Sequence, residues 1–250
     1  MLNIVIPMAG RGSRFAEAGY KDPKPLIDIH GKHMIEVVIK NLQPSEPHRF
    51  IFIVQESHRK EYNLETVISQ HTDAFEIISI DGITEGAAIT VLKAQELIDN
   101  DDPLMIANSD QWVDTDIDVY LQDMKMRNLD GSMLTMTASD AKWSYAKIDA
   151  QGFVTEVIEK VVVSDEATVG IYNFKHGKDF CFFANKMINQ NIRSNNEFYV
   201  APVYTFMAEE GCKIGIYNVG EEGRGMYGLG IPVDLDLFLS LDVSRKATDF

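Results

Sequence analysis

The sequence is organised around residues 2–26, LNIVIPMAGRGSRFAEAGYKDPKPL. The stretch begins with an apolar run rich in Ile and Val, which predicts a buried strand. Gly10 and Gly12 follow the run, and two glycines so close together allow a sharp turn whose backbone N–H groups can surround an anion. Arg14 lies in this turn, and Lys24 stands between two prolines, which hold its backbone stiffly. Such a turn with an Arg and a rigid Lys can hold a polyphosphate and offset its charge.

Two commoner phosphate-binding loops are excluded by the residues of this turn. The Walker loop ends in Gly-Lys followed by Ser or Thr, and the chain contains no such run. The dinucleotide fingerprint requires a third glycine at position 15, which is Phe15 here. The remaining pattern is Gly-x-Gly-Ser-Arg-Phe, followed by Pro-Lys-Pro-Leu-Ile at residues 23–27. This pattern resembles the signature of the sugar-1-phosphate nucleotidylyltransferases, and the resemblance extends over nearly the whole chain.

The composition is typical of a soluble globular protein and limits the classes of partner. Hydrophobic residues make up 45% and charged residues 24% of the 250 residues, so one large domain or two smaller ones could bury a sizeable core. The formal net charge of −15 argues against nucleic acid and against an anionic membrane surface as partners. Cys181 and Cys212 are not spaced as a metal site, and the chain enters a strand at once. We therefore expect free thiols, no signal peptide and a cytoplasmic location.

The first half of the chain alternates between strand and helix patterns. Apolar runs predict strands at 2–8, 49–55, 75–80 and 104–110, and helical periodicity predicts helices at 34–42, 57–71 and 87–98. This alternation predicts an α/β fold with a mostly parallel central sheet and helices on both faces, a Rossmann-like three-layer arrangement. In such sheets the ligand lies beyond the carboxyl ends of the strands.

The second half of the chain is richer in β patterns. We expect strands at 131–137, 145–149, 153–157, 167–174 and 214–219, and helices at 178–188, 200–210 and 234–246. The interpretation is a single domain with an NTP-binding half at 1–130, a β-rich acceptor-binding half at 131–232, and a C-terminal helix at 233–250. Oligomeric state cannot be read from the sequence, and a homo-oligomer is left open.

Asp110 ends the fourth predicted strand, at the edge where a ligand is expected. A carboxylate beside a polyphosphate is repulsive unless a cation bridges them, and Mg²⁺ is commonly held by one or two carboxylates plus substrate phosphates. Asp110 is therefore the predicted metal ligand, with Mg²⁺ as the cofactor. A turn or helix cap is the alternative reading of this residue.

The family resemblance assigns further roles along the chain. It implies three catalytic residues, namely Arg14, Lys24 and Asp110. It implies that the nucleotide is bound by Ala9, Gly10, Gly12 and Ser13 and by Thr84, Glu85, Gly86 and Ala87. It implies an acceptor site of Glu159, Lys160, Gly170, Tyr172, Glu197 and Tyr199, although Val161 stands where the family usually has proline. Taken alone, the segments at 84–88 and 197–199 could be helix caps, and Glu159 and Lys160 could be surface charges.

The family's second metal-binding Asp is missing. Aligning the Gly-x-Pro run at 230–232 places Gly228 at that position, and glycine has no side chain to bind a metal. Three readings stay open. In the first, Asp110 and the substrates hold the metal alone; in the second, another carboxylate (Glu221, Glu222 or Asp234) substitutes; in the third, the protein is catalytically weak. The first two are favoured, because Arg14, Lys24, Asp110 and Lys160 are all retained.

The resemblance implies a nucleotidyltransferase that joins an NTP to a phosphorylated acceptor, such as a sugar 1-phosphate, and releases pyrophosphate. The nucleotide-linked product would serve capsule or other surface-polysaccharide synthesis. The thymidylyl-type Gln and the guanylyl-type Leu-Gly-Thr-Ala are not evident, so CTP or UTP is preferred. The alternatives are a cytidylyltransferase acting on a phosphorylated amino acid or choline-like compound, and a non-catalytic nucleotide or sugar-phosphate sensor.

Overall fold

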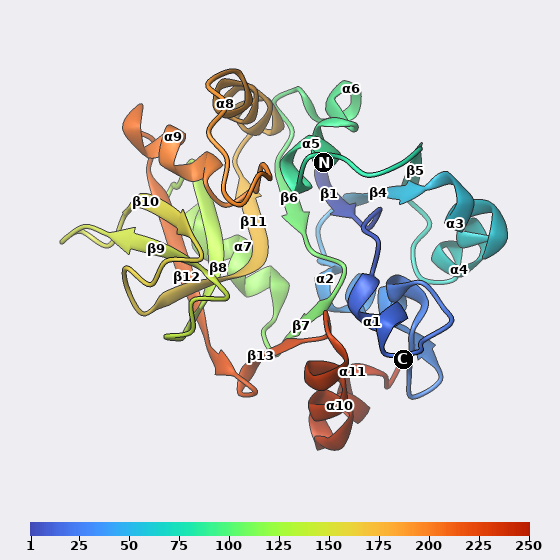
Figure 1. Ribbon diagram of the computed structural model, residues 1–250. Coiled ribbons are helices and arrows are strands. Elements are labelled where there is room, and N and C mark those ends of the chain that lie inside the picture. The colour runs from blue at the N-terminus through green and yellow to red at the C-terminus, as the bar shows by residue number, and fades with distance from the viewer.

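The computed structural model describes all 250 residues, and an 11-stranded sheet runs through it (Figure 1). One half of the sheet is parallel. In it β1 (Leu2–Pro7) lies between β4 (His48–Gln55) and β6 (Leu104–Ala107), and β5 (Phe75–Ile80) lies outside β4. These four strands end at the same edge of the sheet, called here the carboxyl edge, and begin at the amino edge. The predicted α/β class with a mostly parallel sheet is confirmed.

The other half of the sheet is mixed and contains the β-rich region. Here β11 (Glu166–Phe174) runs antiparallel to both β6 and β8 (Gly131–Thr137), and β8 is parallel to β12 (Ile214–Glu222). At the far side β13 (Gly225–Gly228) joins β12 to β7 (Gln111–Val113). A hairpin of β9 (Ser144–Ile148) and β10 (Val154–Glu159) branches from β11. Because of β7 and β13, the segment after Asp110 lies beside residues more than 100 positions later.

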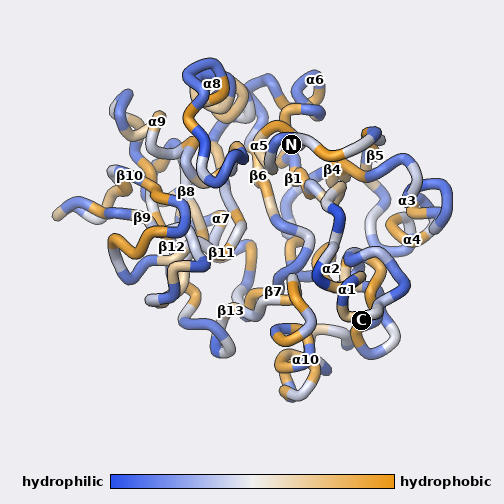
Figure 2. The backbone as a smooth tube through the Cα atoms, viewed as in Figure 1, coloured by the Kyte–Doolittle hydropathy of each residue, from blue (hydrophilic) through white to orange (hydrophobic).

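Both faces of the sheet are buried, because alternate residues of a strand point to opposite faces. In β1, Val5 belongs to one core cluster of 28 residues, whereas Ile4 and Ile6 belong to another of 27. The first core is covered by α5 (Ala87–Leu92), α6 (Gln95–Ile98), α8 (Gly177–Asn189) and α9 (Val203–Glu209). The second is covered by α2 (Met34–Leu42), α4 (Leu64–Ser69) and α7 (Ile117–Met126). Figure 2 shows the matching hydrophobic stretches along β4 and β6 in the interior.

Four of the predicted helices are shorter or interrupted in the structure. The predicted helix 57–71 is divided into α3 (Glu56–Glu61) and α4, because Asn63 adopts a left-handed conformation with φ 48°. The predicted helix 87–98 is divided into α5 and α6, and that at 200–210 begins only after Pro202. The C-terminal helix is divided at the extended Leu241 into α10 (Pro232–Ser240) and α11 (Asp242–Ala247). None of the helices has the length and apolarity required to cross a bilayer.

A third core cluster of 10 residues connects the start of the chain to its end. It contains Phe15 of α1 (Ser13–Glu17), Trp112 of β7, Leu229, and Leu235 of α10. Three short elements lie near it: a 3₁₀ turn (Lys24–Leu26), β2 (Asp28–Ile29) and β3 (Lys32–His33). Each of the four core residues named is one or two positions from a polar or glycine residue at the carboxyl edge. Packing in this cluster therefore fixes those neighbours relative to one another.

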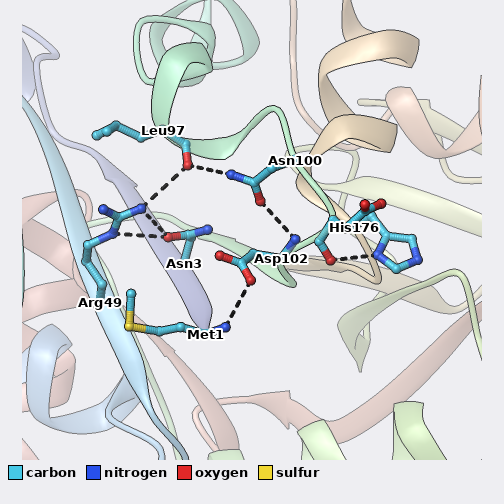
Figure 3. A network of polar contacts seen from close by, with 8 residues as sticks. Met1, Asn3, Arg49, Leu97, Asn100, Asp102 and His176 are labelled. Carbon is cyan, nitrogen blue, oxygen red and sulfur yellow. Dashed lines mark hydrogen bonds and ion pairs between the residues drawn. The ribbon is translucent and has the colours of Figure 1, made fainter.

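The amino edge is held together by a network of polar contacts (Figure 3). The guanidinium of Arg49 donates two hydrogen bonds to Asn3 Oδ1, at 2.8 and 3.1 Å. The backbone N–H of Asp102 donates to Asn100 Oδ1 at 2.8 Å, and the carboxylate of Asp102 pairs with the N-terminal ammonium of Met1 at 3.0 Å. The charged groups drawn at this edge are thus matched by other groups of the chain.

Candidate functional site

The turn after β1 brings the glycine-rich loop against Lys24. Gly12 is the N-cap of α1 with φ 60°, a left-handed conformation that residues with side chains rarely adopt. A Cβ placed on Gly12 would lie 3.2 Å from the Cβ of Lys24, so the two backbone segments can approach because this residue is glycine. Gly10 has no atom within 4 Å of its Cβ position, which leaves open space in front of the loop. The two parts that the sequence predicted to act together are adjacent.

Lys24 and Asp110 form an ion pair, with 2.7 Å between Nζ and Oδ2. Their side chains are only 22% and 24% exposed, so the pair is partly shielded from solvent. Lys24 is held in the 3₁₀ turn after Pro23, and Asp110 follows β6. The structure therefore brings together two predicted catalytic residues that are 86 positions apart in the chain.

The two arginines of the loop have no partner in the chain. Arg11 and Arg14 are exposed, and neither forms a salt bridge or a side-chain hydrogen bond. Arg11 and Arg14 line two different cavities, which are described below as the loop pocket and the acceptor pocket. These unpaired cations can bind anionic groups without first breaking an internal ion pair.

The loop pocket is a cavity of about 470 Å³ between the loop and the segment after β5. Its lining includes several of the residues predicted to bind the nucleotide, namely Ala9, Gly10, Thr84, Gly86 and Ala87. Glu197, predicted on the acceptor side, lines this pocket instead. Glu85 does not line it, because its carboxylate pairs with Arg193. Ala9, Gly10, Gly86 and Ala87 contribute little or no side chain to this lining.

The wall formed by residues 84–88 is fixed by backbone contacts with Phe198. Phe198 N donates to the carbonyl of Glu85 at 2.8 Å, and Ala88 N donates to the carbonyl of Phe198 at 3.0 Å. Gly86 has φ 124°, and a Cβ there would lie 2.5 Å from the backbone nitrogen and oxygen of Phe198. The hydroxyl of Thr84 also hydrogen-bonds Thr90 at 2.5 Å. This segment is therefore more than a capped helix start, since it forms a rigid wall of the loop pocket.

A second cavity of about 370 Å³ lies between β6, β10 and β11, and it is called here the acceptor pocket because it contains most of the residues that the sequence predicts to bind an acceptor. It shares Ala87 with the loop pocket, so the two cavities adjoin. Its lining brings together the predicted residues Arg14, Glu159, Lys160, Gly170, Tyr172 and Tyr199.

Glu159 and Lys160 lie at the end of β10 and have different surroundings. The Ser144 hydroxyl donates a hydrogen bond to the carboxylate of Glu159, and burial raises the pKa of this carboxyl above its usual range. Lys160 is exposed and adopts a left-handed conformation with φ 57°. Its Nζ lies 3.3 Å from the hydroxyl of Tyr199 and has no carboxylate partner, which leaves the ammonium free for an anion.

Gly170 allows two side-chain amides to meet over β11. Its φ is 78°, and a Cβ there would lie 2.2 Å from Asn108 Nδ2 and 2.6 Å from Gln111 Oε1. Gln111 is only 5% exposed, and its Nε2 has no hydrogen-bond partner. The indole Nε1 of Trp143 is likewise buried without a partner. Both residues line the acceptor pocket, and a buried donor without a partner is costly unless a ligand or water satisfies it.

Sequence reasoning missed several residues of the acceptor pocket, namely Asn108, Gln111, Lys142, Trp143, Ser144 and Thr168. Asn108 and Gln111 flank Asp110 at the end of a predicted strand, and that position could have indicated them. No signal in the sequence indicates Lys142 and Trp143, because they reach the pocket only through the placement of the β9–β10 hairpin.

Asp110 fits the role of a ligand for a divalent cation. No group of three or more His, Cys, Asp or Glu side chains in the described chain is arranged to hold a metal by itself. Carboxylate oxygens at a partly shielded strand end suit Mg²⁺ when substrate phosphates complete the coordination. A Cβ on Gly230 would lie 2.5 Å from Asp110 Oδ2, so the glycine preserves the space around this oxygen.

Residues 4–204 match the family model described as "Nucleotidyl transferase". The bifunctional protein GlmU of Staphylococcus carnosus is 25% identical over 87% of this chain and 47% of that protein. The chain therefore spans about half the length of the curated relatives it matches. The crystal structure of a nucleoside-diphosphate-sugar pyrophosphorylase from Vibrio cholerae RC9 is 25% identical, with a TM-score of 0.79 over 95% of this chain and 100% of that one. The inositol-1-phosphate CTP transferase from T. maritima, at 11% identity, has the same fold with a TM-score of 0.73 over 99% of this chain and 96% of that one.

Proposed function

Because the chain belongs to the nucleotidyl transferase family, we propose that it joins an NTP to a phosphorylated acceptor and releases pyrophosphate. The preferred nucleotides are CTP and UTP, and the preferred acceptor is a sugar 1-phosphate. The product would be an activated precursor for capsule or other surface polysaccharide. In this proposal residues 1–130 bind the NTP and residues 131–232 bind the acceptor.

The observation that carries the proposal is the joining of two pockets, one of which is lined by Asn108 and Gln111 on either side of Asp110. The loop pocket and the acceptor pocket meet at Ala87. Arg14, which follows the glycine loop, lines the acceptor pocket, so a cation stands between the loop and the second cavity. This arrangement suits a reaction in which two phosphorylated molecules must be held with their phosphates close together.

The reaction needs positioning and charge neutralisation more than a proton acceptor. An oxygen of the acceptor phosphate attacks the α-phosphorus of the NTP in line. The new P–O bond forms as the bond between the α-phosphorus and the bridging α–β oxygen breaks, and pyrophosphate leaves with that electron pair. The acceptor phosphate is already an anionic nucleophile, so no general base is required. Catalysis therefore rests on fixed cations that stabilise the developing charge.

The residues of the site would divide this work as follows. The backbone of residues 10–13 and the Arg14 guanidinium hold the β- and γ-phosphates. Lys24 stabilises charge on the α-phosphate and on the leaving pyrophosphate, exchanging Asp110 for these oxygens. Lys160, which has no carboxylate partner, holds the acceptor phosphate. Asp110 would hold Mg²⁺, which when bound supplies charge neutralisation across the triphosphate.

The unpartnered donors of the acceptor pocket support an acceptor rich in oxygen. Gln111 Nε2 and Trp143 Nε1 are both buried without a partner. Hydroxyl or carboxylate oxygens of an acceptor would satisfy them, which a hydrocarbon could not do. A sugar phosphate or a phosphorylated amino acid meets this requirement, whereas a choline-like group offers no oxygen at that end.

The proposal is tested by pyrophosphate release with Mg²⁺ for CTP, UTP, ATP, GTP and dTTP against phosphorylated sugars, amino acids and aminoalcohols. Release that requires one NTP and one acceptor together establishes the activity and identifies both substrates. Tight NTP binding with no release across the panel would contradict it and support the non-catalytic sensor, for which the missing side chain at Gly228 is the motivating feature.

A further inference from the structure

We propose that Asp234 is the second carboxylate that acts with Asp110 in binding the divalent cation of the NTP complex. This inference rests on the proposed function. It selects Asp234 from the carboxylates that the sequence leaves open as substitutes for the side chain missing at Gly228.

The segment that carries Asp234 folds back onto Asp110. Gly228 of β13 is paired with Gln111, the residue after Asp110. The backbone N–H of Leu229 donates to the carbonyl oxygen of Asp110 at 2.8 Å. Asp234 then lies in the first turn of α10. The chain therefore approaches Asp110 in the strand pairing and again through Leu229.

Two glycines leave the space that the two carboxylates occupy. A Cβ on Gly230 would lie 2.5 Å from Asp110 Oδ2, and a Cβ on Gly228 would lie 3.2 Å from Asp234 Oδ2. The oxygens of Asp110 and Asp234 thus each lie close to the short segment 228–230, and the charge of Asp110 acts on Asp234. The carboxylate of Asp234 therefore lies next to the position that the Cβ of a side chain at residue 228 would take.

Other carboxylates near this segment are already engaged. Glu221 pairs with Arg224, and Glu222 pairs with Lys142 at 2.8 Å. Asp234 forms neither a salt bridge nor a side-chain hydrogen bond in the chain. Burial, and then the neighbouring charges of Glu222 and Asp110, raise the pKa of Asp234 above its usual range, and Lys142 and Arg14 oppose this rise. A cation between Asp234 and Asp110 would offset the repulsion between these two carboxylates.

Packing holds Asp234 in place without restricting its carboxylate. Leu235, the next residue, is fully buried in the third core cluster together with Trp112, Phe15 and Leu229. The backbones beside Asp110, Arg14 and Gly228 are therefore anchored in the same cluster as that of Asp234. Two carboxylates do not make a complete site, which agrees with the absence of any three-ligand group in the chain. We expect phosphate oxygens of the nucleotide to supply the rest.

The test is Mn²⁺ binding measured by electron paramagnetic resonance, with and without the α,β-methylene analogues of CTP and UTP, which cannot release pyrophosphate. Asp234→Asn is compared with Asp236→Asn, an exposed aspartate two residues along the same helix. We expect Mn²⁺ to bind tightly only with nucleotide, Asp234→Asn to weaken that binding about tenfold or more, and Asp236→Asn to change it less than about twofold. Circular dichroism checks that both variants are folded.

A relocation variant separates loss of a ligand from loss of structure. Gly228 has no left-handed φ, so its backbone accepts a side chain. Gly228→Asp combined with Asp234→Asn should restore a substantial part of the Mn²⁺ affinity. Equal Mn²⁺ affinities for Asp234→Asn and Asp236→Asn would overturn the role of Asp234 alone. Failure of the unmodified protein to bind Mn²⁺ with either analogue would overturn this role and the proposed function together.

Discussion

Strand β6 has an aspartate near each end, and the two have different surroundings. Asp102 precedes the strand at the amino edge, where its carboxylate pairs with the N-terminal ammonium at 3.0 Å within the network of Figure 3. Asp110 follows the strand at the carboxyl edge, where it pairs with Lys24 at 2.7 Å. Asp102 is 45% exposed and Asp110 only 24%. Each carboxylate has a cation, so pairing alone does not distinguish a structural aspartate from a functional one.

The neighbours of the two aspartates make the distinction. Around Asp102 the charged groups are paired or hydrogen-bonded within the chain, and the buried atom left without a partner, Asn3 Nδ2, is uncharged. The carboxyl edge around Asp110 has two charged side chains without a partner, Arg14 and Asp234. It also has two buried N–H donors without a partner, on the side chains of Gln111 and Trp143. Buried polar atoms without partners occur at both edges, but only around Asp110 do charged side chains without partners accompany them, and a bound ligand would offset the cost of leaving those charges unpaired. The comparison predicts large functional effects at the carboxyl edge and small ones at the amino edge.

The largest effect is expected from Lys24→Ala. Removing a cation that stabilises charge mainly in the transition state should lower kcat by about 100- to 1,000-fold. The dissociation constant for the NTP should change much less, because Arg14 and the loop backbone remain. Steady-state kinetics and calorimetric NTP titration measure the two quantities. An unchanged kcat in Lys24→Ala would show that this lysine has no part in the chemistry.

Gly170→Ala and Gly152→Ala place the same side chain at a crowded glycine and at an open one. Gly170 and Gly152 both have positive φ, 78° and 82°, so alanine at either position costs about 1–2 kcal/mol of folding free energy. Only at Gly170 would the new methyl group meet the amides of Asn108 and Gln111. Urea unfolding should show Gly170→Ala to be less stable than Gly152→Ala by about 1–3 kcal/mol. Gly170→Ala should also weaken acceptor binding, and equal behaviour of the two variants would contradict the packing described here.

Trp143→Phe tests whether an unpartnered donor serves the acceptor. The change removes the indole N–H while keeping an aromatic ring. The KM for the acceptor should rise about tenfold, because the loss of one hydrogen bond weakens binding by about that factor. The KM for the NTP should stay the same. A rise in both KM values, or in neither, would place the acceptor elsewhere.

The smallest effect concerns the pH dependence contributed by Glu159. Burial raises the pKa of this carboxyl in the folded state, so folding favours its protonated form. The pKa of this carboxyl is about 4.3 in the unfolded chain and higher in the folded protein. The contribution of Glu159 to the free energy of unfolding therefore decreases as the pH rises through this interval. Glu159→Gln should gain stability relative to the unmodified protein between about pH 4.5 and pH 7. Urea unfolding at both pH values measures this gain, with Glu156→Gln as the control; Glu156 lies on the same strand and is ion-paired with Lys147. A gain independent of pH would contradict the assigned cause.

Much of the fold could be predicted from periodicity, because the buried strands are continuous apolar runs and the helices have one apolar face. The helix interruptions at Asn63 and Leu241 could not, since a single residue leaving the helical conformation barely changes the periodic pattern. The short strands β7 and β13 were also missed. Their pairing depends on contacts between distant segments, and it is this pairing that places Gly228 and Asp234 near Asp110.

The predicted site residues differ in how well local sequence reveals them. Lys24 and Asp110 are each marked by their surroundings, one by prolines and the other by the end of a strand, and the structure places them in contact. Glu197 was assigned to the acceptor but lines the loop pocket, because the backbone bridge through Phe198 carries it there. Lys142 and Trp143 lie in a loop without any motif, and only the three-dimensional arrangement shows that they line the acceptor pocket.

The two aspartates that flank β6 allow a direct test of whether the carboxyl edge is the catalytic site. Pyrophosphate release is measured with Mg²⁺ and the productive NTP–acceptor pair for Asp110→Asn and Asp102→Asn. Both changes are isosteric and both remove the carboxylate from an ion pair. We predict that Asp110→Asn lowers kcat by at least about 100-fold, whereas Asp102→Asn keeps kcat within about twofold of the unmodified protein. Equal kcat values for the two variants would contradict the assignment of the carboxyl edge as the catalytic site.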